Sequence, residues 1–349
     1  MKKQSVTLVQ VAARAGVSAM TASRAISGDG YVSDDTRAKV QAAVAELGYA
    51  PNTLARVIKA GRTNVVGVIV PDITSPAVNP FIAALTEEVR KHDMDLFVYN
   101  AVGLLDERTQ ARHSRLLHGL WDGLIYLLPR MTDEYLRGLE TSNRPIVLIN
   151  FCRRETTLPV VMGDNFNASR DAVASLVDQG HERIAFIKGN HWTGQSEERE
   201  RGYRQALADA GIQIDERLIE QGGFTEQSGL PAAERLLALS PRPTAIFAAN
   251  DEMAIACMSA AHALHIEVPG QLSLIGFDDI PASRIVRPQL TTIRHPAALM
   301  AQAAVQELVR RITRRPGKRQ RIDFPAEMIM RDSAVPPAPA APKRNGRVR

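Results

Sequence analysis

This sequence has very little cysteine and no long hydrophobic run. Its two cysteines, Cys152 and Cys257, lie far apart in a chain of 349 residues and give neither a disulfide framework nor the spacing of a metal site. No stretch approaches the roughly 20 apolar residues that cross a bilayer, and Gln10 and Arg14 interrupt the apolar core that a signal peptide needs. We therefore expect a globular, cytoplasmic protein with no membrane contact, no metal and no cofactor.

An excess of charge of either sign is missing from most of the chain. Residues 1–63 hold nine Lys or Arg and four Asp or Glu, whereas the remaining residues hold 34 of each kind. The net charge of +5 therefore belongs to the first 63 residues. A basic segment on a neutral body fits the neutralisation of DNA phosphates, although a run of charge is more often a solvated face.

The basic segment contains a helix-turn-helix pattern, which favours DNA binding over an αα-hairpin packed in a larger core. Gly16 fits the left-handed end of a first helix, and Ser18 fits the N-cap of a second helix. A third helix is expected to start after Ser33 and to end at Gly48. Three helices within the first 50 residues predict a small DNA-binding headpiece.

From Val65 onward, apolar runs alternate with amphipathic segments, which is typical of βαβ units and a parallel sheet. The expected strands are 65–70, 96–99, 123–127, 146–149, 184–187, 218–221, 245–248, 274–277 and 322–324. The expected helices are 81–92, 107–118, 133–141, 168–178, 197–210, 227–238, 253–265 and 297–313. Pro231 is expected to delay or kink its helix. The elements form two series, so we expect two lobes of similar make-up.

Three ordered blocks of the sequence resemble the lactose/galactose-repressor family of bacterial transcription regulators. These blocks are VTLVQVAARAGVSAMTASRAIS, VSDDTRAKV and LGYAPNTLARVIKAGRTNVVGVIVPD. The resemblance runs from about Val6 to Asp332. It implies an α-helical helix-turn-helix headpiece joined to a two-lobed α/β sensor domain of the type I periplasmic-binding-protein-like fold.

The resemblance also implies a division of the chain. The headpiece takes residues 1–50, a hinge helix and linker take 51–62, and the ligand-binding and dimerisation domain takes 63–332. Within that domain, lobe 1 takes about 63–164 and 294–322, and lobe 2 takes about 165–293 and 323–332. Residues 333–349, which contain the stretch PPAPAAP and four basic residues, are expected to form a disordered tail.

A recognition helix presents its first turns to the edges of the bases, and here these residues are Ala19, Met20, Thr21 and Arg24. The Arg24 side chain can form two hydrogen bonds to a guanine. The resemblance implies that Ala19 and Met20 determine which operator is bound. Core packing is the alternative role for Met20. The resemblance further implies contacts to phosphates by Thr7, Ser18, Tyr31, Ser33 and Asn52. It also implies a hinge helix at 53–59 that contacts DNA through Ala55 and Ile58. Ile58 stands where relatives insert a leucine into the minor groove.

Ligand-binding candidates follow the predicted strands, because open α/β sheets bind ligands at the carboxyl ends of their strands. Asn150, Asn250 and Asp278 have this position. The resemblance adds three effector-binding positions, Phe81, Arg199 and Phe224. Structural roles are the alternatives: Asn250 as a helix N-cap, Asp278 in a turn and Phe81 in the core.

These features predict a dimeric, sequence-specific transcription regulator, more specifically a repressor, with a palindromic double-stranded DNA operator and a sugar or sugar acid as effector. One alternative is a sugar-binding transport or chemoreceptor protein, which an export signal would favour. The other is a sugar-processing enzyme on the same α/β body. The sequence has no GxSxG elbow and no phosphate loop, and His262 and His265 lack a partner for a metal. No heptad run predicts the coiled coil of a tetramer.

Overall fold

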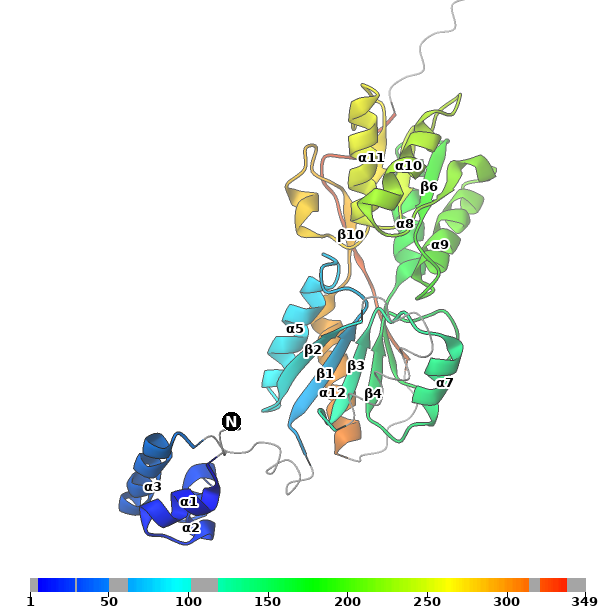
Figure 1. The fold of residues 1–349 in the computed structure, drawn as a ribbon. Coiled ribbons are helices and arrows are strands. Elements are labelled where there is room, and N and C mark those ends of the chain that lie inside the picture. The colour runs from blue at the N-terminus through cyan, green and yellow to red at the C-terminus, as the bar shows by residue number, and fades with distance from the viewer. Residues whose placement is uncertain (1–5, 29, 50–61, 102–118, 314–320, 338–349) are drawn as a thin grey trace, which may run out of the picture. The chain divides into compact units, whose positions relative to one another are not determined.

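The computed structural model describes residues 6–28, 30–49, 62–101, 119–313 and 321–337. The chain divides into two units, Met1–Thr63 and Asn64–Arg349 (Figure 1). Several predictions lie outside the described residues, namely the hinge helix 53–59, the helix 107–118, and the contacts of Asn52, Ala55 and Ile58.

Unit 1 consists of three short helices, α1 (Leu8–Ala15), α2 (Ala19–Ser27) and α3 (Asp34–Leu47). The turn between α1 and α2 depends on Gly16, whose φ of 68° lies in the left-handed region that favours glycine. Small apolar side chains form the core and let the helices approach closely: Val11, Ala12, Ala22, Ala25, Val40 and Ala43. The predicted helix-turn-helix is confirmed.

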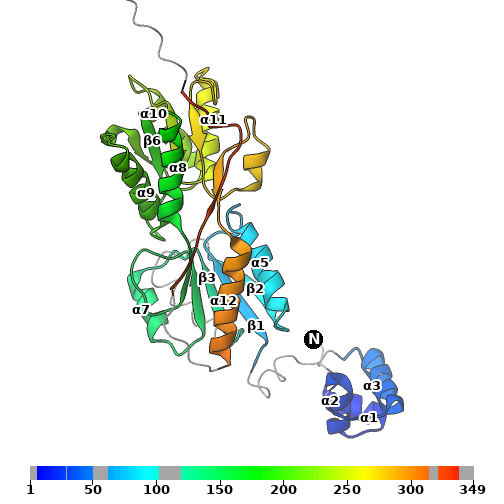
Figure 2. The ribbon, with the colours of Figure 1, turned by 180° about the vertical axis from the view of Figure 1, so that it is seen from behind.

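The first lobe of unit 2 is built on a six-stranded parallel sheet with the order β11-β5-β4-β3-β1-β2. Its strands are β1 (Val65–Val70), β2 (Asp95–Asn100), β3 (Gly123–Leu127), β4 (Ile146–Ile149), β5 (Val160–Gly163) and β11 (Arg321–Phe324). One face is covered by α5 (Asn79–Arg90) and α12 (Ala297–Ile312), and the other face by α7 (Asp133–Thr141) (Figures 1 and 2). The central strands β3 and β4 are therefore buried along their whole length.

The second lobe repeats this architecture on a four-stranded parallel sheet with the order β7-β6-β8-β9. Its strands are β6 (Ile184–Lys188), β7 (Ile219–Gln221), β8 (Ala245–Ala248) and β9 (Ser273–Ile275). Two helix pairs pack on the sheet: α8 (Asn165–Asp178) with α9 (Gln195–Asp209), and α10 (Glu226–Leu237) with α11 (Asp251–Ala263) (Figure 1). The second lobe has its own continuous apolar core.

The chain passes between the two lobes three times, after β5, after β10 (Thr292–Arg294) and after β11. The strand β10 pairs antiparallel with β12 (Glu327–Ile329). Beside this pair, the buried carboxylate of Asp279 accepts hydrogen bonds from Arg284, Arg294 and Arg331. Burial opposes its ionisation, but the three arginines hold the pKa of Asp279 below its usual range. This cluster joins the turn after β9 to β10 and to the segment that follows β12.

The structure differs from the sequence analysis at several places. The strands β5, β10 and β12 are not among the predicted strands. The helix α10 begins at Glu226 and runs through Pro231, so the proline does not delay its start; Thr225 fixes that start as the N-cap of a capping box with Ser228. The strand β11 continues to Phe324, beyond the expected limit of lobe 1 at 322.

The tail begins later than residue 333. The Ser333 hydroxyl is buried and donates a hydrogen bond to the carbonyl oxygen of Leu274 at 2.6 Å. The carbonyl oxygen of Val335 accepts a hydrogen bond from Ser273 Oγ at 2.8 Å. These bonds fix residues 333–335 to lobe 2, while residues 338–349 lie outside the described residues. None of the described helices is long and apolar enough to cross a membrane.

Candidate functional site

The helix α2 carries the four predicted base-reading residues on the surface of unit 1. Ala19, Met20 and Arg24 are exposed, and Thr21 is half-buried. The exposed fraction of Met20 is 66%, so its side chain is not part of the core, which was the alternative for this residue. The apolar contacts of α2 are made by Ala22 and Ala25 on its opposite side. The surface of α2 is thus free to enter a DNA major groove.

The predicted phosphate contacts of unit 1 cluster at the starts of its helices. Thr7, Ser18 and Ser33 are the N-caps of α1, α2 and α3, and each side-chain oxygen accepts a backbone N–H bond. Helix N-termini favour anions, because their first N–H groups are unpaired and the helix dipole is positive there. Tyr31, at 94% exposure, precedes α3. The geometry is therefore compatible with phosphate binding.

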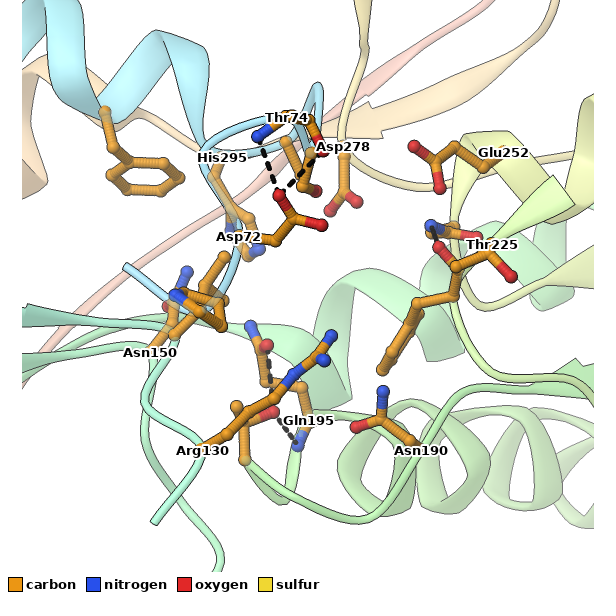
Figure 3. A pocket seen from close by; sticks show the side chains of 18 of the residues that line it. Asp72, Thr74, Arg130, Asn150, Asn190, Gln195, Thr225, Glu252, Asp278 and His295 are labelled. Atoms are coloured by element: carbon orange, nitrogen blue, oxygen red, sulfur yellow. Dashed lines mark hydrogen bonds between the residues drawn. The ribbon is translucent and has the colours of Figure 1, made fainter. Parts of the chain in front are cut away.

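A cavity of about 220 Å³ lies in unit 2 at the carboxyl ends of the strands of both lobes (Figure 3). All six predicted effector-binding residues line it: Phe81, Asn150, Arg199, Phe224, Asn250 and Asp278. It is also lined by polar residues that the sequence analysis did not select, including Asp72, Arg130, Asn190, Gln195, Glu252 and His295. The cavity is smaller than the roughly 300–1,000 Å³ typical of drug-sized pockets, so it suits a small polar ligand.

Arg199, on α9, is the central buried cation of this cavity. Its side chain is 2% exposed, and its guanidinium lies 3.5 Å from the centroid of the Phe277 ring. Nε donates a hydrogen bond to Asn165 Oδ1 at 2.9 Å, and Nη1 donates to the carbonyl oxygen of Ala249. Nη2 is 3.5 Å from Asp278 Oδ1. Arg199 therefore holds three segments of lobe 2 together as well as facing the cavity.

Burial favours the neutral forms of two neighbours of Arg199. Burial raises the pKa of Asp278 to about 6, although Arg199 opposes this effect. Burial and the charge of Arg199 lower the pKa of His295 to about 3. His295 Nε2 lies 3.5 Å from Arg199 Nη2, so a neutral imidazole with an unprotonated Nε2 fits this position. The histidine sits where the chain crosses between the lobes.

The backbone around the cavity adopts conformations that side chains other than glycine rarely take. Asn150, Phe224 and Asp278 have φ values of 57°, 70° and 106°. Leu128, which also lines the cavity, has φ of 50°. Such residues are concentrated at binding sites, where the surrounding structure compensates for the strain. The left-handed residues therefore mark the cavity as a candidate binding site.

The start of α11 positions two of the predicted effector-binding residues. Asn250 is the N-cap, since its Oδ1 accepts the Met253 N–H at 3.1 Å, and its Nδ2 donates to the carbonyl oxygen of Phe224 at 3.0 Å. The buried Asp251 carboxylate accepts the Ile280 N–H at 2.9 Å and so holds the turn that carries Asp278. Asn250 is therefore a helix N-cap, which was the alternative role for this residue. Its hydrogen bond to the carbonyl oxygen of Phe224 also places Phe224 at the cavity.

Comparison with known proteins identifies the family. The family model described as "Bacterial regulatory proteins, lacI family" matches residues 7–52, and that described as "Periplasmic binding protein-like domain" matches residues 173–334. Catabolite control protein A of Priestia megaterium is 33% identical over 338 residues, which cover 94% of this chain and 99% of the relative. The regulator AscG of Escherichia coli strain K12 is 34% identical over 339 residues, with 95% and 99% covered. The chain belongs to the LacI family.

Solved structures extend this LacI-family likeness to nearly the whole chain. The Lac repressor dimer bound to operator and the anti-inducer ONPF matches with a TM-score of 0.84 and 27% identity, covering 95% of this chain and all of that one. The complex of the regulator CelR with cellobiose matches with a TM-score of 0.73 and 30% identity, covering 94% and 100%. The predicted fold is confirmed, and this LacI-family chain is a transcription regulator and not an enzyme.

Sequence reasoning missed a part of the cavity for which a signal exists in the sequence. Asp72, Arg130 and Asn190 each follow a predicted strand closely, as Asn150 does, so the same strand-end argument applies to them. Gln195 and Glu252 lie in the first turns of α9 and α11. Their orientation toward the cavity depends on how the helices pack, which the sequence does not show.

Proposed function

We propose that this LacI-family regulator is a cytoplasmic, dimeric repressor of a palindromic operator, controlled by a sugar or sugar acid in the cavity of unit 2. The observation that carries the proposal is the presence, in one chain, of an exposed base-reading helix and a polar cavity lined by both lobes. Two relatives support the partners: the Lac repressor structure is a dimer bound to operator, and the CelR structure contains cellobiose. A transport protein, a chemoreceptor or a sugar-processing enzyme with the same α/β body does not need a DNA-binding headpiece.

The proposed DNA contacts divide into two classes. Bases are read by Ala19, Met20, Thr21 and Arg24 of α2. Phosphates and the minor groove are contacted by the residues at the helix starts and in the proposed hinge at 51–62, namely Thr7, Ser18, Tyr31, Ser33, Asn52, Ala55 and Ile58. The apolar side chains of Ala19 and Met20 suit thymine methyl groups, so Arg24 supplies the main hydrogen-bonded base contact.

The proposed effector contacts come from both lobes. Phe81 and Asn150 belong to lobe 1, whereas Arg199, Phe224, Asn250 and Asp278 belong to lobe 2. A ligand that touches both lobes favours one arrangement of the lobes over another by its difference in affinity for the two. In the proposed mechanism, that difference shifts the hinge between an ordered and a disordered state and so changes operator affinity.

The proposed DNA-reading role is tested by selecting preferred duplexes from random DNA with the full chain. We then expect Arg24→Ala to lose about 1–3 kcal/mol of discrimination per half-site between the selected and random DNA, because a bidentate contact to guanine is removed. Lys39→Ala is the matched control: it removes one exposed positive charge from α3, whose partner is Asp35. The control should keep the specificity ratio at fixed salt. An unchanged ratio in Arg24→Ala would remove Arg24 from the base-reading residues.

A further inference from the structure

Three carboxylates surround one part of the cavity, and they outnumber the cations available to neutralise them. Asp72 follows β1 in lobe 1, while Glu252 and Asp278 belong to lobe 2, and all three line the cavity. Figure 3 shows the three carboxyl groups facing a common space, with the Arg130 side chain reaching in from the other side. Carboxylates accept hydrogen bonds from neutral hydroxyl groups, but they bind a positively charged donor more strongly.

Glu252 is the least compensated of the three carboxylates. Within the described part of the chain, no side chain or backbone group donates a hydrogen bond to it or forms an ion pair with it. Burial raises the pKa of Glu252 to about 7, and the charges of Asp278, Glu226 and Asp72 add to this effect. A half-buried carboxyl group among like charges is stabilised by a cation from outside the chain.

Neither arginine of the cavity compensates Glu252. Arg199 is committed within lobe 2 to Asn165, Ala249 and Asp278. Arg130 is exposed and forms no ion pair with any residue that the structure describes, but its charge helps to lower the pKa of Asp72. Asp72 has only Thr74 as a hydrogen-bond partner, with Thr74 N and Oγ1 at 2.8 and 2.7 Å from its Oδ1. The carboxylates therefore retain capacity for additional donors.

Independent buried groups show that the cavity is built for a ligand. Asn150 and Gln195 are 1% and 4% exposed and line the cavity, and their amide nitrogens, Nδ2 and Nε2, have no hydrogen-bond partner among the described residues. A buried amide without a partner costs free energy, and a ligand oxygen restores the missing bond. These two donors call for oxygen acceptors on the ligand, whereas the carboxylates call for a donor with positive charge.

A metal ion does not fit the charge excess, because no group of three His, Cys, Asp or Glu within the described ranges is arranged to hold one. We propose that the effector carries an ammonium group, which binds among Asp72, Glu252 and Asp278, and oxygen acceptors, which bind Asn150 and Gln195. An amino sugar has this chemistry. This inference rests on the proposed effector site and names the class of ligand that occupies it.

The test uses isothermal titration of the full chain with matched trios of probes. Each trio consists of a hexosamine, glucosamine, galactosamine or mannosamine, with its parent hexose and its N-acetyl derivative. We expect one hexosamine to bind at least about tenfold more tightly than both neutral members of its trio, because a charge-assisted hydrogen bond to a half-buried carboxylate is lost in them. Glu252→Gln should remove most of that preference.

Glu226→Gln is the matched control, since Glu226 is exposed on α10, adds to the same negative field and does not line the cavity. It should keep the preference for the amine. The proposal is overturned if no trio shows the preference, or if Glu252→Gln retains it. Operator binding of the same preparations, measured without a probe, distinguishes a failure of the proposed ligand class from a failure of the proposed regulator function. If selected DNA is still bound specifically, the ligand class is wrong and the proposed regulator stands.

Discussion

Asp278 and His295 show how one buried cation sets the chemistry of its neighbours. Both side chains touch the guanidinium of Arg199, and burial disfavours the charged form of each. Arg199 partly restores the ionisation of Asp278, but it adds to the penalty on a protonated His295. The result is a site in which a carboxylate can titrate near neutral pH while the imidazole stays neutral.

The depressed pKa of His295 predicts a loss of stability in acid. Between about pH 6.5 and pH 3, the unfolded chain binds a proton at this histidine and the folded chain does not, so protonation favours unfolding as the pH falls. Near pH 5 this amounts to about 2 kcal/mol. We expect His295→Gln to lose less stability than the parent between about pH 7 and pH 5. Asp278, with a raised pKa, acts in the opposite direction in both proteins.

The measurement is urea unfolding followed by tryptophan fluorescence. The chain has two tryptophans, Trp121 and Trp192, and both lie in unit 2. Parallel stability curves for the parent and His295→Gln across this pH range would show that folding does not lower the pKa of His295, which contradicts the prediction.

At the residue scale, the sequence allowed some of the cavity to be predicted. Asn150, Asn250 and Asp278 follow from the rule that ligands bind at the ends of parallel strands, and Arg199 and the two phenylalanines follow from resemblance. The left-handed backbone at Phe224 and Asp278 could not be predicted, because no glycine marks it and tertiary contacts impose it. The acidic group of Asp72 and Glu252 joins residues 180 positions apart, which only folding brings together.

At the scale of elements, the Asp279 cluster links β10 to the segment that follows β12. Its carboxylate is 1% exposed and is shared by Arg284, Arg294 and Arg331. Replacing one member of a buried ionic group leaves the others uncompensated, which costs more than the group itself contributes.

We therefore expect Asp279→Asn to lower the free energy of unfolding of unit 2 by about 3–5 kcal/mol. Asp323→Asn is the control, because Asp323 pairs with Arg321 at the surface, where both side chains are about half exposed. Its loss should stay below about 1 kcal/mol. Urea unfolding of both variants beside the parent decides the point. Equal, small losses would show that the cluster does not hold the crossing together.

Elements with strong local signals were predictable, and those defined by pairing were not. The helices of unit 1 begin and end at the predicted caps because Ser18, Ser33 and the glycines act through local backbone geometry. The strands β5 and β12 have four and three residues, too short for a clear period. They exist because β4 and β10 offer partners. Residues 333–335 are held by the same kind of long-range hydrogen bond.

At the scale of the whole molecule, the division of the chain into two units follows the distribution of charge and of predicted helices and strands along the sequence. The basic first 63 residues form one compact unit, and the neutral remainder forms another. The switch from helical pattern to βαβ pattern near residue 64 made this division predictable. Only the family resemblance predicted that the two lobes meet around one cavity. The chain crosses between the lobes at residues 163–165, 294–297 and 324–327, and local sequence patterns do not show such crossings.

The central claim is that a ligand in the cavity of unit 2 controls DNA binding by unit 1. The most direct measurement is the affinity of the full chain for its selected operator, across a panel of sugars, sugar acids and amino sugars, for the parent and Asp278→Ala. We predict that at least one compound changes the parent's operator affinity by about 5–150-fold and leaves that of Asp278→Ala unchanged, while both bind operator equally without it. If Asp278→Ala follows the parent with the same midpoint, or if no compound changes the parent's affinity, the claim is contradicted.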